Sequence, residues 1–203
     1  GREKKGSIYE GGLRVPSIIE YPSKFTPSRI AAPASSTDIY PTLLALTKIE
    51  IENQPPVDGI SLLPFLTGEE SKRSKPIGFW HNFTGGQSTR SDRIIKELME
   101  AQQNGQPNPF PERVLKNVND FPKYTANSHQ SGHAALLDWP LKIHAIYSKK
   151  KTTWELYDLS RDPMETKLLN EQESKRFSRM QKQLTAWQKS VLKSHSGHDF
   201  QNR

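Results

Sequence analysis

KGSIYEGGLRVP, at residues 5–16, is the most informative stretch of this 203-residue chain. It sets Lys5 and Arg14 on either side of the adjacent glycines Gly11 and Gly12, and an apolar run follows at once. Adjacent glycines allow tight turns and positive φ, and they let the backbone approach a ligand closely. The stretch therefore predicts a loop that can hold a small oxyanion, followed by a buried strand at residues 14–21. A surface hairpin with ordinary solvated charges is the alternative that these residues leave open.

The same stretch resembles the K-G-x-x-x-E-G-G-x-R-V-P segment of the sulfatase family, within the alkaline phosphatase-like superfamily. In that family the lysine contacts the sulfate group, so the resemblance implies an active-site role for Lys5. Glu10 and Arg14 are then expected to brace the loop, for example through an ion pair. The family's metal-binding Asp-Asn pair lies shortly upstream of this segment. The resemblance therefore implies a C-terminal part of a sulfatase that lacks the nucleophile and the metal ligands.

Later segments resemble the same family in the expected order. STDIYPTLL, at residues 36–44, matches S-x-D-I-x-P-T-L-L and predicts a helix over residues 37–48 with Asp38 as a cap. DGISLLPFLTG follows and matches D-G-x-S-L-L-P-x-L-x-G, with Gly68 as a natural helix C-cap. FTPSR, further upstream, has the tail of the family's C/S-x-P-S-R nucleophile motif. Its first residue, Phe25, has no oxidisable heteroatom, so we interpret it as a proline turn.

Three segments after residue 75 predict a small antiparallel sheet. They are residues 76–81, residues 134–147 with an interruption at Pro140, and residues 153–159, which alternate apolar and polar side chains. Residues 134–169 also resemble the family's C-terminal signature, in which W-K-L is followed by E-L-Y-D-L-x-x-D-P-x-E.

Helical spacing predicts two further helices. One spans residues 91–103, and the polar, proline-bearing insertion at residues 104–132 that follows is expected to border the substrate entrance. The other spans residues 171–194, with Asn170 and Glu173 as a box-like N-terminal cap. Its apolar stripe is expected to cover one face of the small sheet: Phe177, Met180, Leu184, Trp187 and Val191.

Together these patterns and the resemblance predict an α/β protein with two parts. Residues 1–70 would be the C-terminal part of an alkaline phosphatase-like α/β sheet domain. Residues 71–203 would be a small antiparallel-sheet subdomain closed by the C-terminal helix. Hydrophobic residues make up only 33% of the chain, which fits part of a larger protein or a domain with long polar loops. The lack of cysteine excludes disulfides and thiol chemistry within these residues, and no run has the length of a transmembrane helix.

Candidate site residues follow from the chemistry of a sulfate ester. Its hydrolysis needs a nucleophile, a divalent cation, and fixed positive charges around the sulfate oxygens. The resemblance implies a formylglycine nucleophile and a Ca²⁺ ion bound by Asp and Asn oxygens, all outside this chain. Only the lysine role maps onto it, at Lys5, and no metal ligand is assigned. His81 and His133 flank the polar insertion and are candidates for lining a substrate subsite, with strand-end roles as the alternative.

The resemblance implies hydrolysis of a sulfated small molecule or glycan, such as a sulfated sugar or an aryl sulfate, by a secreted or periplasmic enzyme. A phosphoesterase or phosphonate hydrolase of the same superfamily is an alternative, because a lysine beside an oxyanion serves phosphate as well. A non-catalytic module that binds polyanions is another. The net charge is +7, and residues 171–203 hold seven basic and three acidic side chains. A solvated helix face is the favoured explanation of this charge, so no nucleic acid partner is expected.

Overall fold

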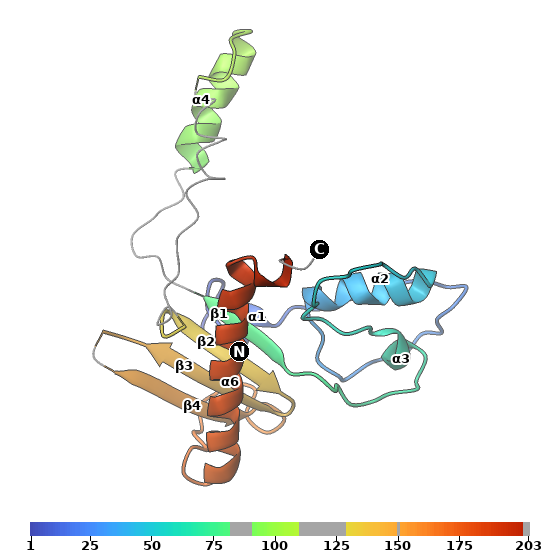
Figure 1. The fold of residues 1–203 in the computed structure, drawn as a ribbon, viewed down its shortest axis with the longest axis vertical. Helices are drawn as coiled ribbons and strands as arrows, with labels where there is room; N and C mark the ends of the chain where they lie inside the picture. Colours follow the sequence, from blue (N-terminus) through green and yellow to red (C-terminus); the bar gives the residue numbers. More distant parts are fainter. Residues whose placement is uncertain (82–90, 110–128, 150, 201–203) are drawn as a thin grey trace. The chain divides into compact units, whose positions relative to one another are not determined.

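The computed structural model describes the backbone of residues 1–81, 91–109, 129–149 and 151–200. The chain divides into two compact units, one made of Gly1–Phe83 with His129–Arg203 and the other of Thr84–Ser128. The second unit contains helix α4, Ser91–Gln103, as predicted (Figure 1). Most of the polar insertion lies outside the described residues, so its place at a substrate entrance stays a prediction. The division of the chain near residue 70 also stays a prediction.

A four-stranded antiparallel sheet forms the centre of the first unit (Figure 1). Its strands, neighbours in space in the order of the chain, are β1 Ile77–His81, β2 His133–Asp138, β3 Leu141–Tyr147 and β4 Thr152–Asp158. Trp139 and Pro140 form the turn between β2 and β3, which is the interruption expected from Pro140. The predicted strands and their antiparallel pairing are therefore confirmed, and the described residues form a mixed α/β structure.

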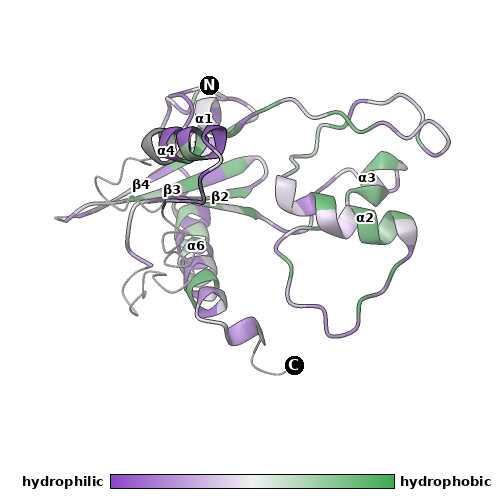
Figure 2. Ribbon diagram, turned by 90° about the horizontal axis from the view of Figure 1, so that it is seen from above, coloured by the Kyte–Doolittle hydropathy of each residue, from purple (hydrophilic) through white to green (hydrophobic). Residues whose placement is uncertain are grey.

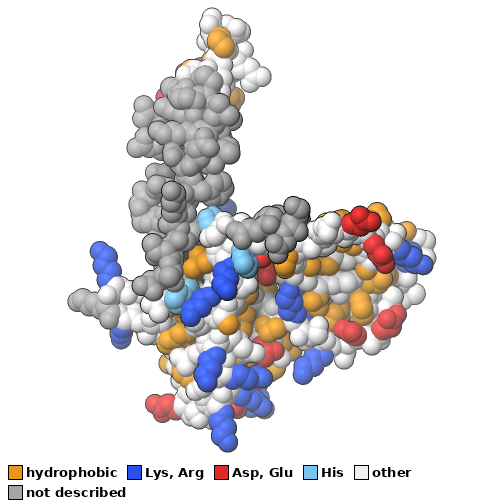
Figure 3. All heavy atoms as spheres, viewed as in Figure 1, with side chains coloured by type: hydrophobic (Ala, Val, Ile, Leu, Met, Phe, Trp, Pro, Cys, Tyr) orange, Lys and Arg blue, Asp and Glu red, His pale blue; other side chains and the backbone are white. Residues whose placement is uncertain are grey.

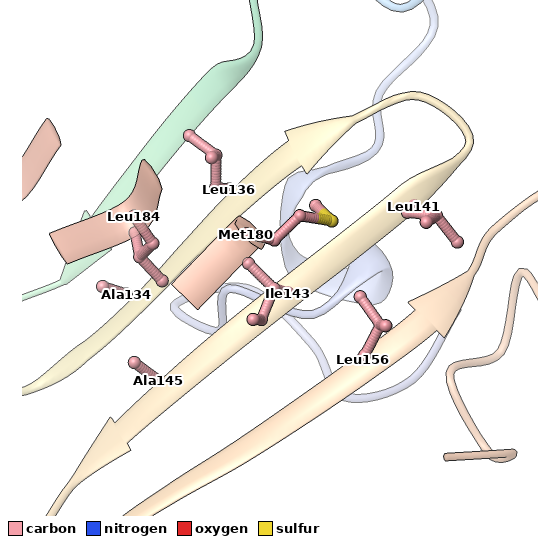
Figure 4. Packing of buried hydrophobic residues seen from close by; sticks show 8 residues of the cluster. All are labelled: Ala134, Leu136, Leu141, Ile143, Ala145, Leu156, Met180 and Leu184. Atoms are coloured by element: carbon pink, nitrogen blue, oxygen red, sulfur yellow. The ribbon is translucent and has the colours of Figure 1, made fainter. Parts of the chain in front are cut away.

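Helix α6, Ser174–His195, covers one face of the sheet. Met180 and Leu184 of the helix are fully buried against alternate residues of three strands (Figure 4): Ala134, Leu136, Leu141, Ile143, Ala145 and Leu156. Phe177 and Trp187 pack against the same cluster. The ring of Trp187 lies directly on Gly78 of β1, where any Cβ would collide with it. The apolar stripe of the terminal helix thus covers the sheet as predicted.

The start of α6 differs from the prediction, because Asn170 bonds to the sheet and not to the helix. Its side-chain amide accepts a hydrogen bond from the Leu156 N–H at 2.9 Å and donates one to the Trp154 carbonyl at 2.8 Å. Glu173 stands at the N-cap without a side-chain hydrogen bond to the helix. Because β4 is an edge strand, its unpaired backbone groups compete for the amide and take it from the helix.

The opposite face of the sheet is covered by the N-terminal segment, residues 2–13. Helix α1, Glu10–Leu13, lies on the other side of the sheet from α6 (Figure 2). Tyr9 of this segment packs with Ile77, Leu137, Tyr157 and Leu159 in a second apolar cluster. Side chains alternate between the two faces of a strand. Lys142 and His144 of β3 therefore point toward the N-terminal segment, and the stretch that carries Lys5 rests on this sheet.

A small helical layer is built around one buried carboxylate. Its elements are the 3₁₀ helix η1 Ser36–Asp38, α2 Ile39–Thr47 and α3 Leu63–Leu66. Asp38 is fully buried, accepts the Ser35 and Ile60 N–H groups, and forms two bonds with Arg73 at 2.7 and 2.8 Å. Its predicted cap role is confirmed, and it also ties η1 to the loop before α3. Gly68 has a positive φ and ends α3 with the backbone bonds of a Schellman motif, as expected.

The strand predicted at residues 14–21 is wrong. These residues belong to no helix or strand after α1, and their apolar side chains are exposed, 75% for Val15 and 92% for Ile18. A β-branched run forms a strand only when it finds a neighbouring strand and a surface to pack on. Within the described residues this run finds neither.

Candidate active site

Lys5 stands on a tight turn at residues 4–7. The Ser7 N–H donates to the Lys4 carbonyl at 3.0 Å, and Gly6 has a φ of +93°. A positive φ at the third residue is what a type II turn requires, and glycine adopts it without strain. The Lys5 side chain is exposed and has no hydrogen bond or ion pair with any described residue. Its ammonium is therefore presented to solvent from a well-defined turn.

The adjacent glycines have a different role from the one predicted. Gly11 and Gly12 lie inside α1 without a positive φ, so the turn belongs to Gly6. A Cβ at Gly11 would collide with the carbonyl oxygens of residues 2 and 3, and a Cβ at Gly12 with those of Lys4 and Ser7. The two glycines do permit a close backbone contact, but the contact is with the loop at residues 2–7 and not with a ligand. They let the loop that carries Lys5 lie directly against α1.

Arg2 and Tyr9 attach the two sides of this loop to β4. The Arg2 guanidinium lies 4.0 Å from the centre of the Tyr9 ring and donates to the Tyr157 hydroxyl at 3.1 Å. The Tyr9 hydroxyl donates to Glu155 Oε2 at 2.6 Å, and the Tyr157 hydroxyl donates to the same oxygen at 3.0 Å. Burial and the hydrogen bond to Glu155 raise the pKa of Tyr9 and raise the pKa of Tyr157 to about 12. Both phenols therefore remain proton donors at neutral pH.

A buried ion-pair cluster lies beneath the loop. Lys142 Nζ is 2.8 Å from Glu10 Oε1 and 3.1 Å from Glu165 Oε1, and both Lys142 and Glu165 are 0% exposed. Burial alone would raise the pKa of Glu165. The hydrogen bond from His144, the Glu10 N–H and the Lys142 charge outweigh it and hold that pKa below its ordinary value. Glu10 therefore braces the loop as expected, but through Lys142; an ion pair with Arg14 does not form.

His133 and His144 complete the cluster. Glu165 accepts from His144 Nε2 at 2.9 Å, and His144 Nδ1 lies 2.9 Å from His133 Nε2. Because the ionised carboxylate only accepts, His144 carries its proton on Nε2, and His133 donates from its own Nε2. Burial, with His144 beside it, lowers the pKa of His133 to about 4. Burial likewise lowers the pKa of His144, so both rings are neutral at pH 7.

The two predicted histidines are neighbours in the structure, but neither forms a hydrogen bond with Lys5 among the described residues. His81 and His133 are direct cross-strand partners on β1 and β2. His81 is exposed, whereas His133 is buried with its ring edge against Tyr9. Their contact with a substrate stays a prediction. Sequence reasoning assigned no role to Lys142 or Glu165. The available signal was Lys142 inside a mostly apolar strand, at a position that alternation places on a covered face.

The described residues offer no metal centre. Among the side chains that the structure describes, no group of three or more His, Asp or Glu residues is placed to hold a metal ion. A Ca²⁺ site therefore does not fit the side chains of this part of the chain. No helix in the described part is long and apolar enough to span a membrane.

Comparison with known proteins extends these observations. No protein-family model matches the chain. Mouse steryl-sulfatase is 32% identical over 93 residues, which are 40% of this chain and 15% of that protein. A sulfatase of Formosa agariphila is 37% identical over 95 residues, 44% of this chain and 17% of that protein. Human arylsulfatase A is 34% identical over 79 residues, 39% of this chain and 15% of that protein. The chain thus spans less than a fifth of these relatives.

Two solved structures are similar at low sequence identity. One is a phosphonate monoester hydrolase of Agrobacterium radiobacter, with a TM-score of 0.40 and 19% identity over 76% of this chain and 25% of that one. The other is a protein bound to its substrate D-glucosamine-2-N,6-O-disulfate, with a TM-score of 0.40 and 16% identity over 81% of this chain and 25% of that one. The sequence relatives named here are all sulfatases, so 39–44% of this chain is similar in sequence to part of a sulfatase.

Proposed function

We propose that the chain supplies one wall of the active site of a sulfate ester hydrolase, with Lys5 contacting the sulfate group. The observation that carries the proposal is the turn at residues 4–7. It presents an exposed ammonium from a loop bound to the sheet at both ends, in a chain whose sequence relatives are sulfatases. A sulfated sugar or an aryl sulfate is the proposed substrate, and a secreted or periplasmic location is expected with it.

The chemistry suits a lysine at this place. Hydrolysis of a sulfate ester develops negative charge on the sulfate oxygens, and a fixed cation lowers the barrier only if it is already in position. An ammonium is a compact point charge that donates up to three hydrogen bonds. Formylglycine and Ca²⁺, which the family resemblance implies, would supply the nucleophile and polarise the sulfate. The role proposed for Lys5 beside them is binding and charge stabilisation.

The test uses the longest natural polypeptide that contains the chain, with 4-nitrophenyl sulfate and glucosamine 6-sulfate as substrates. Lys5→Ala is expected to lower kcat by about 10²–10³-fold, as for loss of one charge-stabilising donor. Lys4→Ala is the matched control, because it removes the same charge from the neighbouring exposed residue of the turn and should leave kcat within about twofold. Normal turnover by Lys5→Ala would refute the assigned role.

Two further measurements separate the enzymatic alternatives. The 203-residue chain alone is expected to hydrolyse no sulfate ester, so turnover by the isolated chain would contradict the assignment of the nucleophile to other residues. The longer polypeptide is expected to hydrolyse 4-nitrophenyl sulfate with a higher kcat/KM than 4-nitrophenyl phosphate or a phenyl phosphonate ester. The reverse preference would favour a phosphoesterase or phosphonate hydrolase.

One observation favours a second candidate function, the binding of a polyanion by α6. The helix carries six Lys and Arg side chains and no carboxylate, and Figure 3 shows cationic side chains over its exposed side. Lys175, Lys182 and Lys189 follow one another at heptad spacing, are exposed, and form no ion pair with a described residue. Arg176 and Arg179 are paired with carboxylates at 3.6 and 3.3 Å. The unpaired lysines thus form a row of positive charge along the helix.

The test of the second candidate is the salt dependence of heparin binding. The chain is expected to bind heparin with an affinity that falls steeply with salt, because each neutralised anionic group releases counterions. The double change Lys182→Gln and Lys189→Gln should flatten this dependence. Lys48→Gln with Lys72→Gln, a charge-matched pair of exposed lysines outside α6, is the control. Binding that ignores both salt and the α6 lysines would remove this candidate.

A further inference from the structure

The Lys142 ammonium is bound mainly by the N-terminal segment. It donates to the Ile8 carbonyl and to Glu10 Oε1, each at 2.8 Å, and it lies 3.1 Å from Glu165 Oε1. Both hydrogen bonds of Lys142 go to residues that closely follow the turn of Lys5, and Glu165 adds an ion pair. The positive charge of Lys142 on β3 therefore binds the N-terminal segment to the sheet.

Glu165 holds the same segment with its second oxygen. Its Oε1 faces Lys142 and His144 of the sheet, while its Oε2 accepts the Glu10 N–H at 2.6 Å. Its own carbonyl accepts from Arg2 at 3.1 Å. Glu165 has a φ of +53°, a conformation that costs a residue other than glycine about 1–2 kcal/mol. The chain keeps this strained position and thereby places one carboxylate between the sheet and the N-terminal segment.

Lys5 lies between the points that are held. Arg2 is attached before the turn, and Ile8 and Glu10 are attached after it. The Gly11 N–H also donates to the Arg2 carbonyl at 2.9 Å, which closes the loop on itself. A short loop with both ends fixed has few accessible conformations. The backbone position of Lys5 is therefore set by contacts that Lys5 itself does not make.

Stability alone does not account for a charged pair in this place. Burying two charges costs several kcal/mol each, and replacing such a pair with apolar residues of similar volume is often neutral or stabilising. We propose that Lys142 and Glu165 are positioning residues for Lys5, which hold the N-terminal segment on the sheet so that the Lys5 ammonium stands where the oxyanion binds. This inference rests on the proposed function. A displacement of about 1 Å at such a group can lower turnover by about 10²-fold.

A double-mutant cycle in the longer polypeptide tests the proposal. Gln at position 165 offers one acceptor oxygen, so an NH₂ group faces either the Glu10 N–H or the donors of Lys142 and His144. Glu165→Gln is expected to lower kcat/KM about 10–100-fold for 4-nitrophenyl sulfate. In a Lys5→Ala background, Glu165→Gln should change kcat/KM by less than about twofold, because Glu165 acts through Lys5. Multiplied losses in the double variant would overturn the proposal.

Two controls keep a positional effect apart from general destabilisation. Glu171→Gln makes the same chemical change at an exposed carboxylate and should leave kcat/KM within about twofold. Amide hydrogen exchange in the Glu165→Gln variant should speed up at Ser7, Glu10 and Gly11 by at least about tenfold, and not in the centre of α6. An equal increase in the exchange rate in α6 would contradict the proposal that Glu165 positions Lys5.

The outcomes also separate this proposal from the function on which it rests. If the unmodified polypeptide hydrolyses no sulfate ester, the proposed function fails. The exchange experiment needs no turnover, so it then still decides whether Glu165 fixes the N-terminal segment. Turnover by the unmodified polypeptide, with unchanged exchange at Ser7 and Glu10 in the variant, would overturn the positioning role alone.

Discussion

Lowering the pH from 7 to 4 is expected to reduce the free energy of unfolding by about 3 kcal/mol through His133 alone. Burial, with His144 beside it, lowers the pKa of His133 from 6.5 to about 4 in the folded protein. A difference of one pKa unit corresponds to about 1.4 kcal/mol. His133 is only 9% exposed, so solvent does little to reduce this cost. Because domains have a total stability of about 5–15 kcal/mol, a loss of this size is readily measured.

The sign follows from which state binds the proton first. Well above pH 6.5 the ring is neutral in both states and contributes no pH dependence. Between pH 6.5 and about 4 the unfolded chain binds a proton that the folded chain does not, so the free energy of unfolding falls as the pH falls. The lowered pKa of His144 acts in the same direction. The lowered pKa of Glu165 adds to the loss below its ordinary value of 4.5, where the unfolded chain protonates first.

Urea unfolding followed by far-ultraviolet circular dichroism, at half-unit steps from pH 8 to pH 4, measures this dependence. His133→Gln keeps an N–H donor for His144 and removes the titrating ring. Below pH 6.5 the unfolding free energy of the variant should therefore fall less steeply with falling pH than that of the unmodified protein. The two slopes should differ by up to about 1.4 kcal/mol per pH unit. As the pH approaches 8, the difference between the two proteins should become independent of pH. A flat profile for the unmodified protein down to pH 4.5, or an equal slope in the variant, would refute the reasoning.

Three substitutions test other parts of the structure by urea unfolding and hydrogen exchange. Gly12→Ala should cost about 1–3 kcal/mol, because its Cβ meets the carbonyls of the turn at residues 4–7; a neutral effect would mean that the loop does not lie against α1. Arg73→Leu leaves the buried carboxylate of Asp38 unpaired and should cost about 3–5 kcal/mol, with faster exchange in α2; unchanged exchange there would contradict the pairing. Met180→Ala should cost about 2–5 kcal/mol, and a loss below 1 kcal/mol would contradict its place in the core.

Local periodicity was enough to predict most secondary structure, because it depends only on neighbouring residues. The alternation in β4 and the three-and-four spacing in α6 identify a strand and the helix that covers it. The same reasoning failed at residues 14–21, where an apolar run lacks a neighbouring strand within the described residues. It also failed at Asn170, whose amide has two sets of competing partners and bonds to the edge of β4.

The sequence by itself determined the sulfatase resemblance, the strands and terminal helix of the sheet, and Lys5 as the candidate contact for an oxyanion. Only the tertiary structure decided what holds Lys5 in place. Glu10 and Lys142 are 132 residues apart, and no local pattern indicates that they form an ion pair. Their pairing depends on which face of β3 is turned to the N-terminal segment and on how closely α1 approaches the loop at Gly12. Burial and charge compensation act through space, so the buried cluster could be found only in the folded chain.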